Sequence, residues 1–358
     1  MAISPLPLEP RLTSLSHGGG CGCKIAPAVL AELLRTAAAP LPCAALLVGR
    51  ETGDDAAVYR LNDAQAVVAT TDFFMPIVDE PFDYGRISAT NALSDIYAMG
   101  ATPLFALAIV GMPLKVLSSV VIREVLRGGE SVCAAAGIPV AGGHSIDSLE
   151  PIYGLAAIGV VAPQDLKRNS EGRAGDALVL GKPLGVGVLA AALKSGRLGA
   201  TGYATLIETT TRLNRAGAGL ARVPGVHAMT DVTGFGLLGH LLGMCRGAGL
   251  GAELAMAAVP LLPGVNELAG AGVVSGAAAR NWAAYRDAVT LGAPLGALAR
   301  DLLCDPQTSG GLLVACSDAA VPAVLAEFRS GDCAEATVIG RMVAGAATVR
   351  VDATPGLQ

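Results

Sequence analysis

The chain has little charge and few aromatic side chains. Charged residues make up 15% of its 358 residues, and Phe, Trp and Tyr together make up 4%. Globular proteins usually carry about 25% charged residues, so we expect much of this surface to be buried in an oligomer. The 30 acidic residues outnumber 25 scattered Lys and Arg. This argues against a nucleic-acid partner, which needs a basic face.

Long hydrophobic runs and a dense set of cysteines are also missing. The longest apolar stretch, residues 104–112, is far shorter than the ~20 residues of a membrane span, so no membrane partner is expected. Residues 1–11 lack the pattern of a signal peptide, which predicts a cytoplasmic protein. Eight cysteines are too sparse for a disulfide scaffold. Four have apolar neighbours and are predicted to be buried thiols: Cys133, Cys245, Cys304 and Cys316.

The usual phosphate loop of ATP-binding proteins is absent as well. Gly181-Lys182 resembles its end, but proline follows Lys182, and Asp176 stands where a glycine is needed. Two other glycine patterns, at 185–190 and 234–239, are each typical of a helix that binds a dinucleotide. A nicotinamide- or flavin-dependent oxidoreductase therefore remains the alternative enzyme class, although such short patterns are common.

A glycine-rich segment lies near the start of the chain. Residues 16–24 read Ser-His-Gly-Gly-Gly-Cys-Gly-Cys-Lys. Such a segment cannot pack a core, but it can wrap closely around a small ligand and move off it again. A thiol is a useful nucleophile only as thiolate, and a nearby cation favours that form. Lys24 can supply this cation to Cys21, or it can bind a phosphate. In another interpretation Cys21 and Cys23 hold a metal or sense redox state, but no second ligand pair has suitable spacing.

After this segment, strand patterns alternate with helical ones, which is typical of an α/β protein. The expected strands are 46–48, 56–59, 66–70, 104–110, 152–161, 177–180, 311–315 and 336–339, and the expected helices include 26–38, 84–99 and 117–136. A polar stretch at 162–175 is expected to join two domains. We predict a mobile N-terminal segment with the glycine-rich loop at 1–45, an N-terminal α/β domain that binds ATP and metal at 46–162, and a C-terminal α/β domain at 163–358.

Five aspartates are expected in loops or at element ends: Asp54, Asp55, Asp72, Asp95 and Asp231. Asp95 has apolar neighbours, and a carboxylate near a core is costly unless a cation compensates it. Mg²⁺ takes oxygen ligands and typically joins carboxylates to substrate phosphates. Helix caps and turns would explain any one of these aspartates. The set, together with Cys21 and Lys24, predicts a metal cluster that neutralises a polyphosphate.

Two further stretches are interpreted as loops near a ligand. They are 141–147, Ala-Gly-Gly-His-Ser-Ile-Asp, and 304–311, Cys-Asp-Pro-Gln-Thr-Ser-Gly-Gly. The glycines of the first can present backbone N–H groups to an anion. A structural histidine and a turn before a buried strand are the plainer interpretations.

In their order, and over nearly the whole chain, these motifs resemble the selenophosphate synthetase (selenide, water dikinase) family. The matching stretches are 17–25, 54–58, 71–79, 90–95, 141–147, 229–236 and 302–311. The resemblance implies ATP-dependent synthesis of selenophosphate from selenide and water, with release of AMP and phosphate. The product would be a selenium donor for selenocysteine and selenouridine formation. Mg²⁺ is implied as cofactor, K⁺ as activator and ATP as substrate.

The same resemblance implies a fold and partners. The fold is α/β (α+β), with two domains like those of the ATP-binding aminoimidazole ribonucleotide synthetase. The chain is implied to form a homodimer whose N-terminal sheets join into a barrel. A selenium-delivery protein is a further candidate partner.

Roles are implied residue by residue. Cys21 matches the catalytic position, and Lys24 matches the catalytic lysine, which also contacts the nucleotide. The matched metal ligands are Asp55, Asp95 and Asp231, of which Asp95 also lies at the nucleotide. The other matched nucleotide contacts are Thr52, Gly53, Asp54 and Asp72, together with Gly143, His144 and Ser145, which reach across the dimer.

Overall fold

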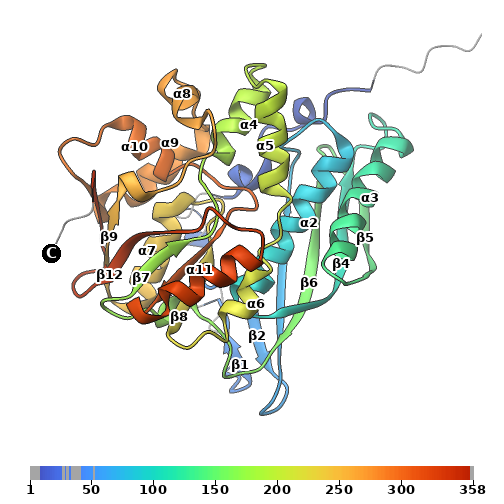
Figure 1. Ribbon diagram of the computed structural model, residues 1–358. Coiled ribbons are helices and arrows are strands. Elements are labelled where there is room, and N and C mark those ends of the chain that lie inside the picture. Colours follow the sequence, from blue (N-terminus) through green and yellow to red (C-terminus); the bar gives the residue numbers. More distant parts are fainter. Residues whose placement is uncertain (1–8, 26–28, 30–31, 34–41, 51–52, 355–358) are drawn as a thin grey trace, which may run out of the picture.

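The computed structural model describes residues 9–25, 29, 32–33, 42–50 and 53–354, which form two sheets with helices packed between and around them (Figure 1). Strands before residue 162 build the first sheet, and strands after residue 176 build the second. No helix in this described part is both long and apolar enough to cross a membrane. Thr52 and most of the expected helix at 26–38 lie outside the described residues.

The N-terminal sheet has six strands in the order β1-β2-β3-β6-β4-β5. Neighbouring strands are antiparallel except β4 and β5, which are parallel. Inward and outward side chains alternate along β6, so Tyr153, Leu155 and Ala157 are buried. The strands are β1 Leu46–Val48, β2 Ala57–Arg60, β3 Ala66–Phe74, β4 Thr102–Met112, β5 Val140–Asp147 and β6 Ile152–Val161.

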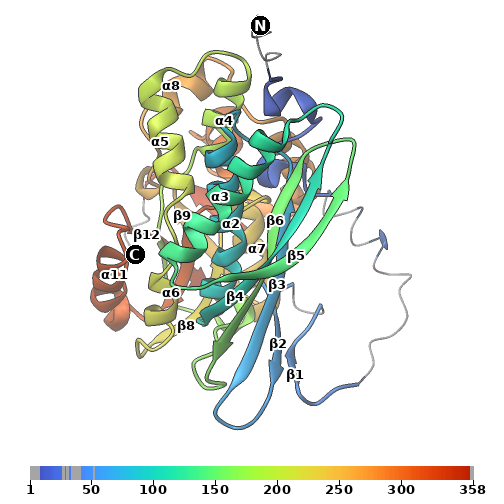
Figure 2. The same cartoon turned by 90° about the vertical axis from the view of Figure 1, so that its right-hand side faces the viewer.

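Two helices, α2 (Pro81–Ala98) and α3 (Ser119–Ala135), cover one face of this sheet (Figure 2). Glycines let them approach closely, since a Cβ on Gly85 would lie 1.9 Å from the carbonyl oxygen of Val125. The C-terminal domain packs on the other side of α2 through β8, α5 and α6. Asp95, in the last turns of α2, is therefore held where the two domains meet.

No described part of the chain covers the opposite face of the N-terminal sheet. Large apolar side chains are exposed on its strands: Tyr59, Phe73, Leu104 and Leu107. The edge strand β5 is exposed along nearly its whole length. Apolar patches and strand edges of this kind are usually covered by another element or another chain.

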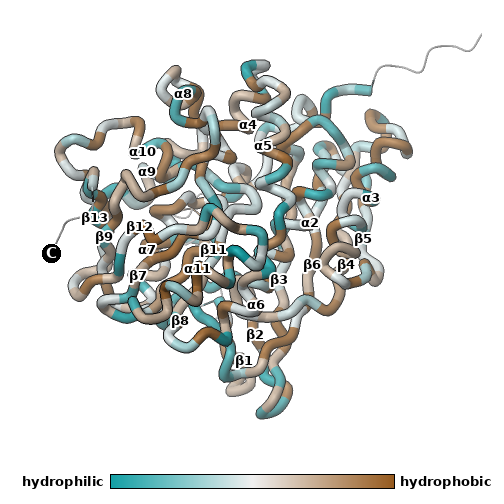
Figure 3. The backbone as a smooth tube through the Cα atoms, in the orientation of Figure 1, coloured by the Kyte–Doolittle hydropathy of each residue, from teal (hydrophilic) through white to brown (hydrophobic). Residues whose placement is uncertain are grey.

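The C-terminal sheet has seven strands in the order β10-β13-β9-β12-β7-β11-β8. Strands β7 and β11 are buried along their whole length, and Figure 3 shows hydrophobic residues concentrated there. The strands are β7 Ala177–Leu180, β8 Val226–Asp231, β9 Gly251–Ala255, β10 Val289–Leu291, β11 Leu312–Cys316, β12 Thr337–Val343 and β13 Val349–Asp352. The helices are α4 Val186–Lys194, α5 Ala200–Thr210, α6 Ala216–Leu220, α7 Gly236–Ala248, α8 Val265–Gly270, α9 Gly276–Tyr285, α10 Ala297–Leu303 and α11 Val321–Ser330.

Several expectations about local structure need correction. Residues 140–147 form the edge strand β5 and not a loop. Asp72 lies inside β3 and not at an element end, because its buried carboxylate faces a polar cavity and the strand continues past it. Asp231 does lie at an element end, as the last residue of β8, but this strand was not among those expected. The four cysteines expected to be buried thiols are buried.

Candidate active site

A cavity of about 900 Å³ lies between the two domains, and both domains supply its walls. Lys24 follows the short helix η2 (Gly20–Cys23), Asp55 lies in the turn before β2, and Asp72 comes from β3. Asp95 comes from α2 and Asp231 from the end of β8. These distant residues meet because α2 is packed between the N-terminal sheet and β8.

The structure brings most of the expected site residues together. Those that line the cavity are Lys24, Gly53, Asp54, Asp55, Asp72, Asp95 and Asp231. Cys21 lies beside them and is 1% exposed. Gly143, His144 and Ser145 are not among the lining residues, because they are exposed on β5, which β6 and β4 separate from β3.

Cys21 belongs to a buried hydrogen-bond network. Its thiol donates to Oδ1 of Asn91 (3.1 Å), and its backbone N–H donates to the hydroxyl of Thr308 (3.0 Å). The amide of Asn91 donates to Oδ2 of Asp72 (2.7 Å), and the ammonium group of Lys24 donates to the same oxygen (3.2 Å). Asn91 thus links the thiol to the carboxylate that pairs with Lys24.

At one position of the loop, Gly20, the backbone conformation and the lack of space require glycine. Gly20 has φ +54, and a Cβ there would lie 2.3 Å from the hydroxyl oxygen of Thr308. Its backbone N–H donates to the carbonyl of Met75 (2.9 Å), and its carbonyl accepts the thiol of Cys23 (2.9 Å). The loop is therefore fastened to both domains, through Met75 on one side and Thr308 on the other.

The charge states of the loop differ from those expected. Burial raises the pKa of Cys21 well above its ordinary value, and the positive charge of Lys24 offsets only part of this rise. The thiol is therefore neutral here, and not the thiolate that the sequence suggested. Burial lowers the pKa of Lys24, but the charge of Asp72 contributes to a larger rise, so Lys24 stays protonated.

Each of the three expected metal ligands accepts a hydrogen bond from a hydroxyl group. Thr230 donates to Oδ1 of Asp55 (2.9 Å), Thr70 to Oδ2 of Asp95 (2.6 Å) and Ser94 to Oδ2 of Asp231 (2.5 Å). The other oxygen of Asp55, Oδ2, is buried and has no hydrogen-bond partner within the described residues. Such an atom is normally satisfied in the working state of a protein.

The electrostatics of this cluster fit a bound cation. Burial raises the pKa of Asp55 and Asp95, and repulsion from Asp231 raises both further. Burial also raises the pKa of Asp231 to about 6. Ligand atoms of Asp55, Asp231 and His240 lie within 4.8 Å of one another. The carboxylate oxygens of Asp55 and Asp231 suit a hard divalent ion, which would replace their repulsion by attraction, and Asp95 lies outside this group of three.

Sequence reasoning missed the wall that α7 contributes. Nε2 of His240 accepts the backbone N–H of Thr233 (3.1 Å), and burial lowers its pKa to about 3. Gly239, Gly243 and Gly247 also line the cavity, and a Cβ on Gly243 would meet nothing within 4 Å. The repeat of glycine every four residues, on one face of a helix, was the available signal.

The glycine patterns weighed as dinucleotide sites have other roles. The backbone N–H groups of residues 185–188, at the start of α4, donate to the side chains of Gln307 and Asp305. The chain's own side chains thus lie where a pyrophosphate would bind, which removes the support for a nicotinamide site. Lys182 is buried and donates to two backbone carbonyls. The second pattern, 234–239, leads into α7 and the cavity wall.

Known proteins resemble this chain over nearly all of its length. Residues 53–161 match the family AIR synthase related protein, N-terminal domain, and residues 173–352 match its C-terminal domain. A selenide, water dikinase of Burkholderia pseudomallei is 68% identical over 342 residues, 96% of this chain and 97% of that protein. One of Pseudomonas straminea is 62% identical over 352 residues, 98% and 99% of the two chains. The solved hydrogenase maturation protein HypE in complex with ATP shares the fold, with a TM-score of 0.62, 17% identity and coverage of 82% and 84%.

Proposed function

The chain belongs to the AIR synthase related family and, within it, to the selenide, water dikinases, and we propose that the cavity between its domains is where it performs their reaction. The relatives confirm the expected two-domain α/β fold and the expected reaction, the ATP-dependent synthesis of selenophosphate from selenide. The observation that carries the proposed site is that Lys24 and aspartates from both domains line one cavity.

The metal is proposed to be Mg²⁺, held by Asp55, Asp95 and Asp231 with His240 beside it. The unpartnered Oδ2 of Asp55 supports this placement. When bound, Mg²⁺ neutralises charge on the transferring phosphoryl group. The hydroxyls of the neighbouring Ser and Thr residues fix the carboxylates beforehand, so little reorganisation is needed. K⁺ is retained as a proposed activator without an assigned site.

The nucleotide is proposed to lie along the cavity from the glycines of α7 to Lys24. Gly243 leaves open space beside it. Lys24 is protonated and can pass from Asp72 to a phosphate oxygen. Thr52, Gly53 and Asp54 are proposed nucleotide contacts, of which Thr52 lies outside the described residues. The ATP complex of HypE, a protein of the same fold, supports ATP as the occupant.

Cys21 is proposed to contact the selenium substrate. At neutral pH the selenium substrate is the hydrogen selenide anion, which is a nucleophile without further deprotonation, so no catalytic base is needed. A neutral buried thiol beside it is therefore consistent with catalysis, and the protonated Lys24 reduces its repulsion from the triphosphate. The closed loop would keep water from the γ-phosphoryl group during the transfer.

We also propose a homodimer through the uncovered face of the N-terminal sheet. The exposed apolar residues Tyr59, Phe73, Leu104 and Leu107 support a partner on this face. In that dimer Gly143, His144 and Ser145, on the edge strand β5, would reach the nucleotide of the other copy. A selenium-delivery protein is retained as a proposed partner, and the cytoplasm as the proposed location.

An anaerobic assay tests the proposed function directly. The protein is incubated with ATP, Mg²⁺ and selenide, and phosphorus NMR is used to detect a selenium-coupled signal together with AMP. Asp231→Asn should lose this signal, whereas Asp287→Asn, at a fully exposed aspartate, should keep it. Formation of ADP alone, or no turnover by the unmodified protein, would contradict the proposal.

A further inference from the structure

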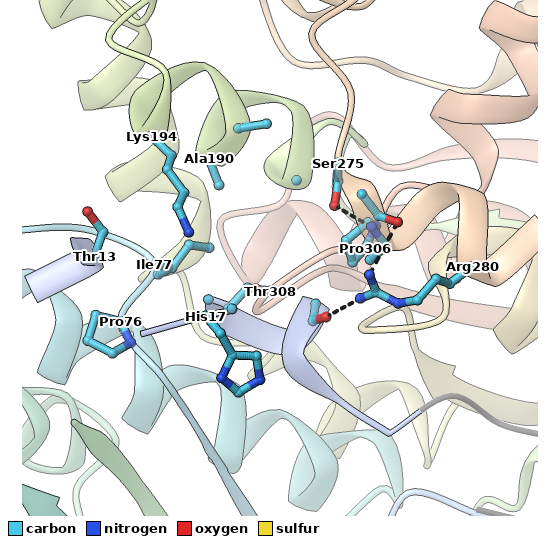
Figure 4. A pocket seen from close by; sticks show the side chains of 17 residues that line it. Thr13, His17, Pro76, Ile77, Ala190, Lys194, Ser275, Arg280, Pro306 and Thr308 are labelled. Atoms are coloured by element: carbon cyan, nitrogen blue, oxygen red, sulfur yellow. Dashed lines mark hydrogen bonds between the residues drawn. The ribbon is translucent and has the colours of Figure 1, made fainter. Parts of the chain in front are cut away.

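A second pocket lies on the other side of the glycine-rich loop, and the reaction described above assigns it no role. We call it the loop pocket. It measures about 230 Å³ and is walled by the loop, by α4 and by the start of α9 (Figure 4). Pockets that bury drug-sized ligands usually measure about 300–1,000 Å³. The loop pocket is therefore suited to a ligand smaller than a nucleotide.

The loop pocket is cationic. Lys194 from α4 and Arg280 from α9 reach it from different sides, and His17 borders it (Figure 4). Lys194 has no hydrogen-bond or ion-pair partner in the described part of the chain. Among the residues that the structure describes, Arg280 donates only to the backbone carbonyls of Gly22 (2.8 Å) and Gly276 (3.4 Å). The described lining residues include no carboxylate.

The carboxylates beside the pocket are hydrogen-bonded to residues other than Lys194 and Arg280. Glu150 accepts from the ring of His17 (3.0 Å), and Asp79 accepts from Thr13 (2.6 Å). Asp305 is fully buried and accepts the N–H groups at the start of α4. The charges of Lys194 and Arg280 are therefore not neutralised inside the pocket.

The loop pocket adjoins Cys21. Gly22, Ala277 and Arg280 line both the loop pocket and a small void whose walls include Cys21 and Lys24. Lys24 also lines the large acidic cavity. Cationic side chains thus follow one path, from Arg280 past Cys21 to Lys24, and this path meets the space assigned to ATP only at its Lys24 end.

We propose that the loop pocket binds the selenium substrate, as the hydrogen selenide anion, and admits it to Cys21 from the side opposite ATP. Two permanent positive charges without a lining carboxylate favour an anion, and the small volume favours a small one. The aspartates of the large cavity would repel the same anion. Inorganic phosphate is the competing occupant, since the reaction releases it. The inference rests on the proposed function.

Kinetics of charge-removing variants test the inference. Lys194→Gln and Arg280→Gln, singly and together, are compared with Arg286→Gln, an exposed arginine outside the pocket. In the double variant we expect KM for selenide to rise at least tenfold, while KM for ATP and kcat stay within twofold. Lys194 does not bond to the loop, so Lys194→Gln tests the loss of positive charge without removing a contact that holds the loop in place. The control should match the unmodified protein.

Each contrary outcome has a distinct meaning. If the unmodified protein makes no selenophosphate, the proposed function fails. If it does, an unchanged KM for selenide in the double variant overturns the inference alone. An equal rise of KM for ATP also overturns it, because Arg280 would then only hold the loop in place. Weaker inhibition by phosphate with unchanged KM for selenide would assign the pocket to phosphate and overturn the selenide assignment.

A second measurement needs no turnover. Peptide mass spectrometry follows alkylation of Cys21 by iodoacetate, an anion, and by iodoacetamide, its neutral counterpart. If the loop pocket attracts anions, the double variant should lower the ratio of the two rates at least threefold, and Arg286→Gln should leave it unchanged. An unchanged ratio in the double variant would overturn the inference even if the enzyme is inactive.

Discussion

The two sides of the glycine-rich loop carry opposite charge. On one side Asp55, Asp95 and Asp231 line a large cavity, and on the other Lys194 and Arg280 line a small pocket without carboxylates among its described residues. The acidic side holds an anionic substrate only through cations, whereas the cationic side attracts an anion directly. A single loop thus separates the proposed chemistry of Mg²⁺ and phosphate from that of selenide.

The two sides also differ in their effect on the stability of the fold. Burial and mutual repulsion raise the pKa values of the aspartates, so the acidic cavity opposes folding when no cation is present. Lys194 and Arg280 keep contact with solvent, so their charges cost little. Substitutions on the acidic side should therefore separate function from stability, and those in the loop pocket should affect substrate affinity alone.

The largest effect is expected when the acidic side loses charge. Asp55→Asn, Asp95→Asn and Asp231→Asn should each lower turnover by about 10³-fold or more because metal binding is lost. Each metal-free variant should be as stable as the unmodified protein, or more stable, because a repelling buried charge is gone. Steady-state kinetics and urea unfolding in chelator measure the two effects. Full activity in two of the three variants would disprove the metal cluster.

A smaller loss is expected for the cation that joins the two sides. Lys24→Ala should lower kcat by about 10²-fold or more, because one charge that faces the transferring phosphoryl group disappears. The matched control is Lys115→Ala, at an exposed lysine outside the cavity. Kinetics with saturating ATP measure the effect. Activity equal to that of the control would exclude Lys24 from the reaction.

The sequence pointed to the aspartates that the structure brings into one cavity, but it gave no indication of the cationic side. A set of five aspartates that includes Asp55, Asp95 and Asp231 was identifiable from the sequence, because their number and the apolar neighbours of Asp95 indicated a metal cluster, and the family resemblance singled out these three as metal ligands. Lys194 and Arg280 stand in ordinary helices, and only the packing of α4 and α9 against the loop brings them together. Their role is a property of the tertiary structure.

The sequence-based predictions that were wrong or incomplete also depend on tertiary structure. The apolar alternation that locates strands stops at Asp72 and Asp231, so their strands were predicted too short or missed. His240 was not identified because a single histidine on an apolar helix usually has a structural role. The charge state of Cys21 could not be inferred from its neighbour Lys24, since burial outweighs that charge. The predicted mobility of residues 1–45 stays a prediction.

Ligand binding on the acidic side should protect the loop that divides the two sides. With a non-hydrolysable ATP analogue and Mg²⁺, Lys24 gains a phosphate partner and the loop should be held shut. We expect proteolytic cleavage between residues 16 and 25, and alkylation of Cys21, to slow about tenfold or more. Limited proteolysis followed by mass spectrometry measures both. Equal rates with and without nucleotide would mean that the site is preformed.

The two thiols of the loop should differ. Cys21→Ser should lose most activity, whereas Cys23→Ser should retain it within about threefold, because the thiol of Cys23 bonds to the backbone, donating to the carbonyl of Gly20, and a hydroxyl can replace it there. Anaerobic kinetics of the two variants, each checked for folding, provide the comparison. An equal loss in both would favour a mechanism with paired thiols.

The smallest effect is expected for the pH dependence of stability at Asp305, which lies behind the loop pocket and bonds to the start of α4. Burial raises the pKa of Asp305 to about 7, compared with about 3.9 in an unfolded chain. The folded state thus holds a proton that the unfolded chain has released, so this stabilisation is complete below about pH 4 and is lost as pH rises through 7, by at most about 1.4 kcal/mol per unit. Asp305→Asn should abolish this slope.

Fluorescence of the single tryptophan, Trp282 in α9, reports unfolding of the elements around the loop pocket. Urea unfolding at pH 5, 6, 7 and 8 should show the unmodified protein losing stability relative to Asp305→Asn as pH rises, while Asp287→Asn follows the unmodified protein. A constant difference across this range would mean that Asp305 is ionised in the folded state. The N–H groups of α4 would then stabilise a carboxylate, and Asp305 would place a fixed negative charge behind the loop pocket, weakening its attraction for anions.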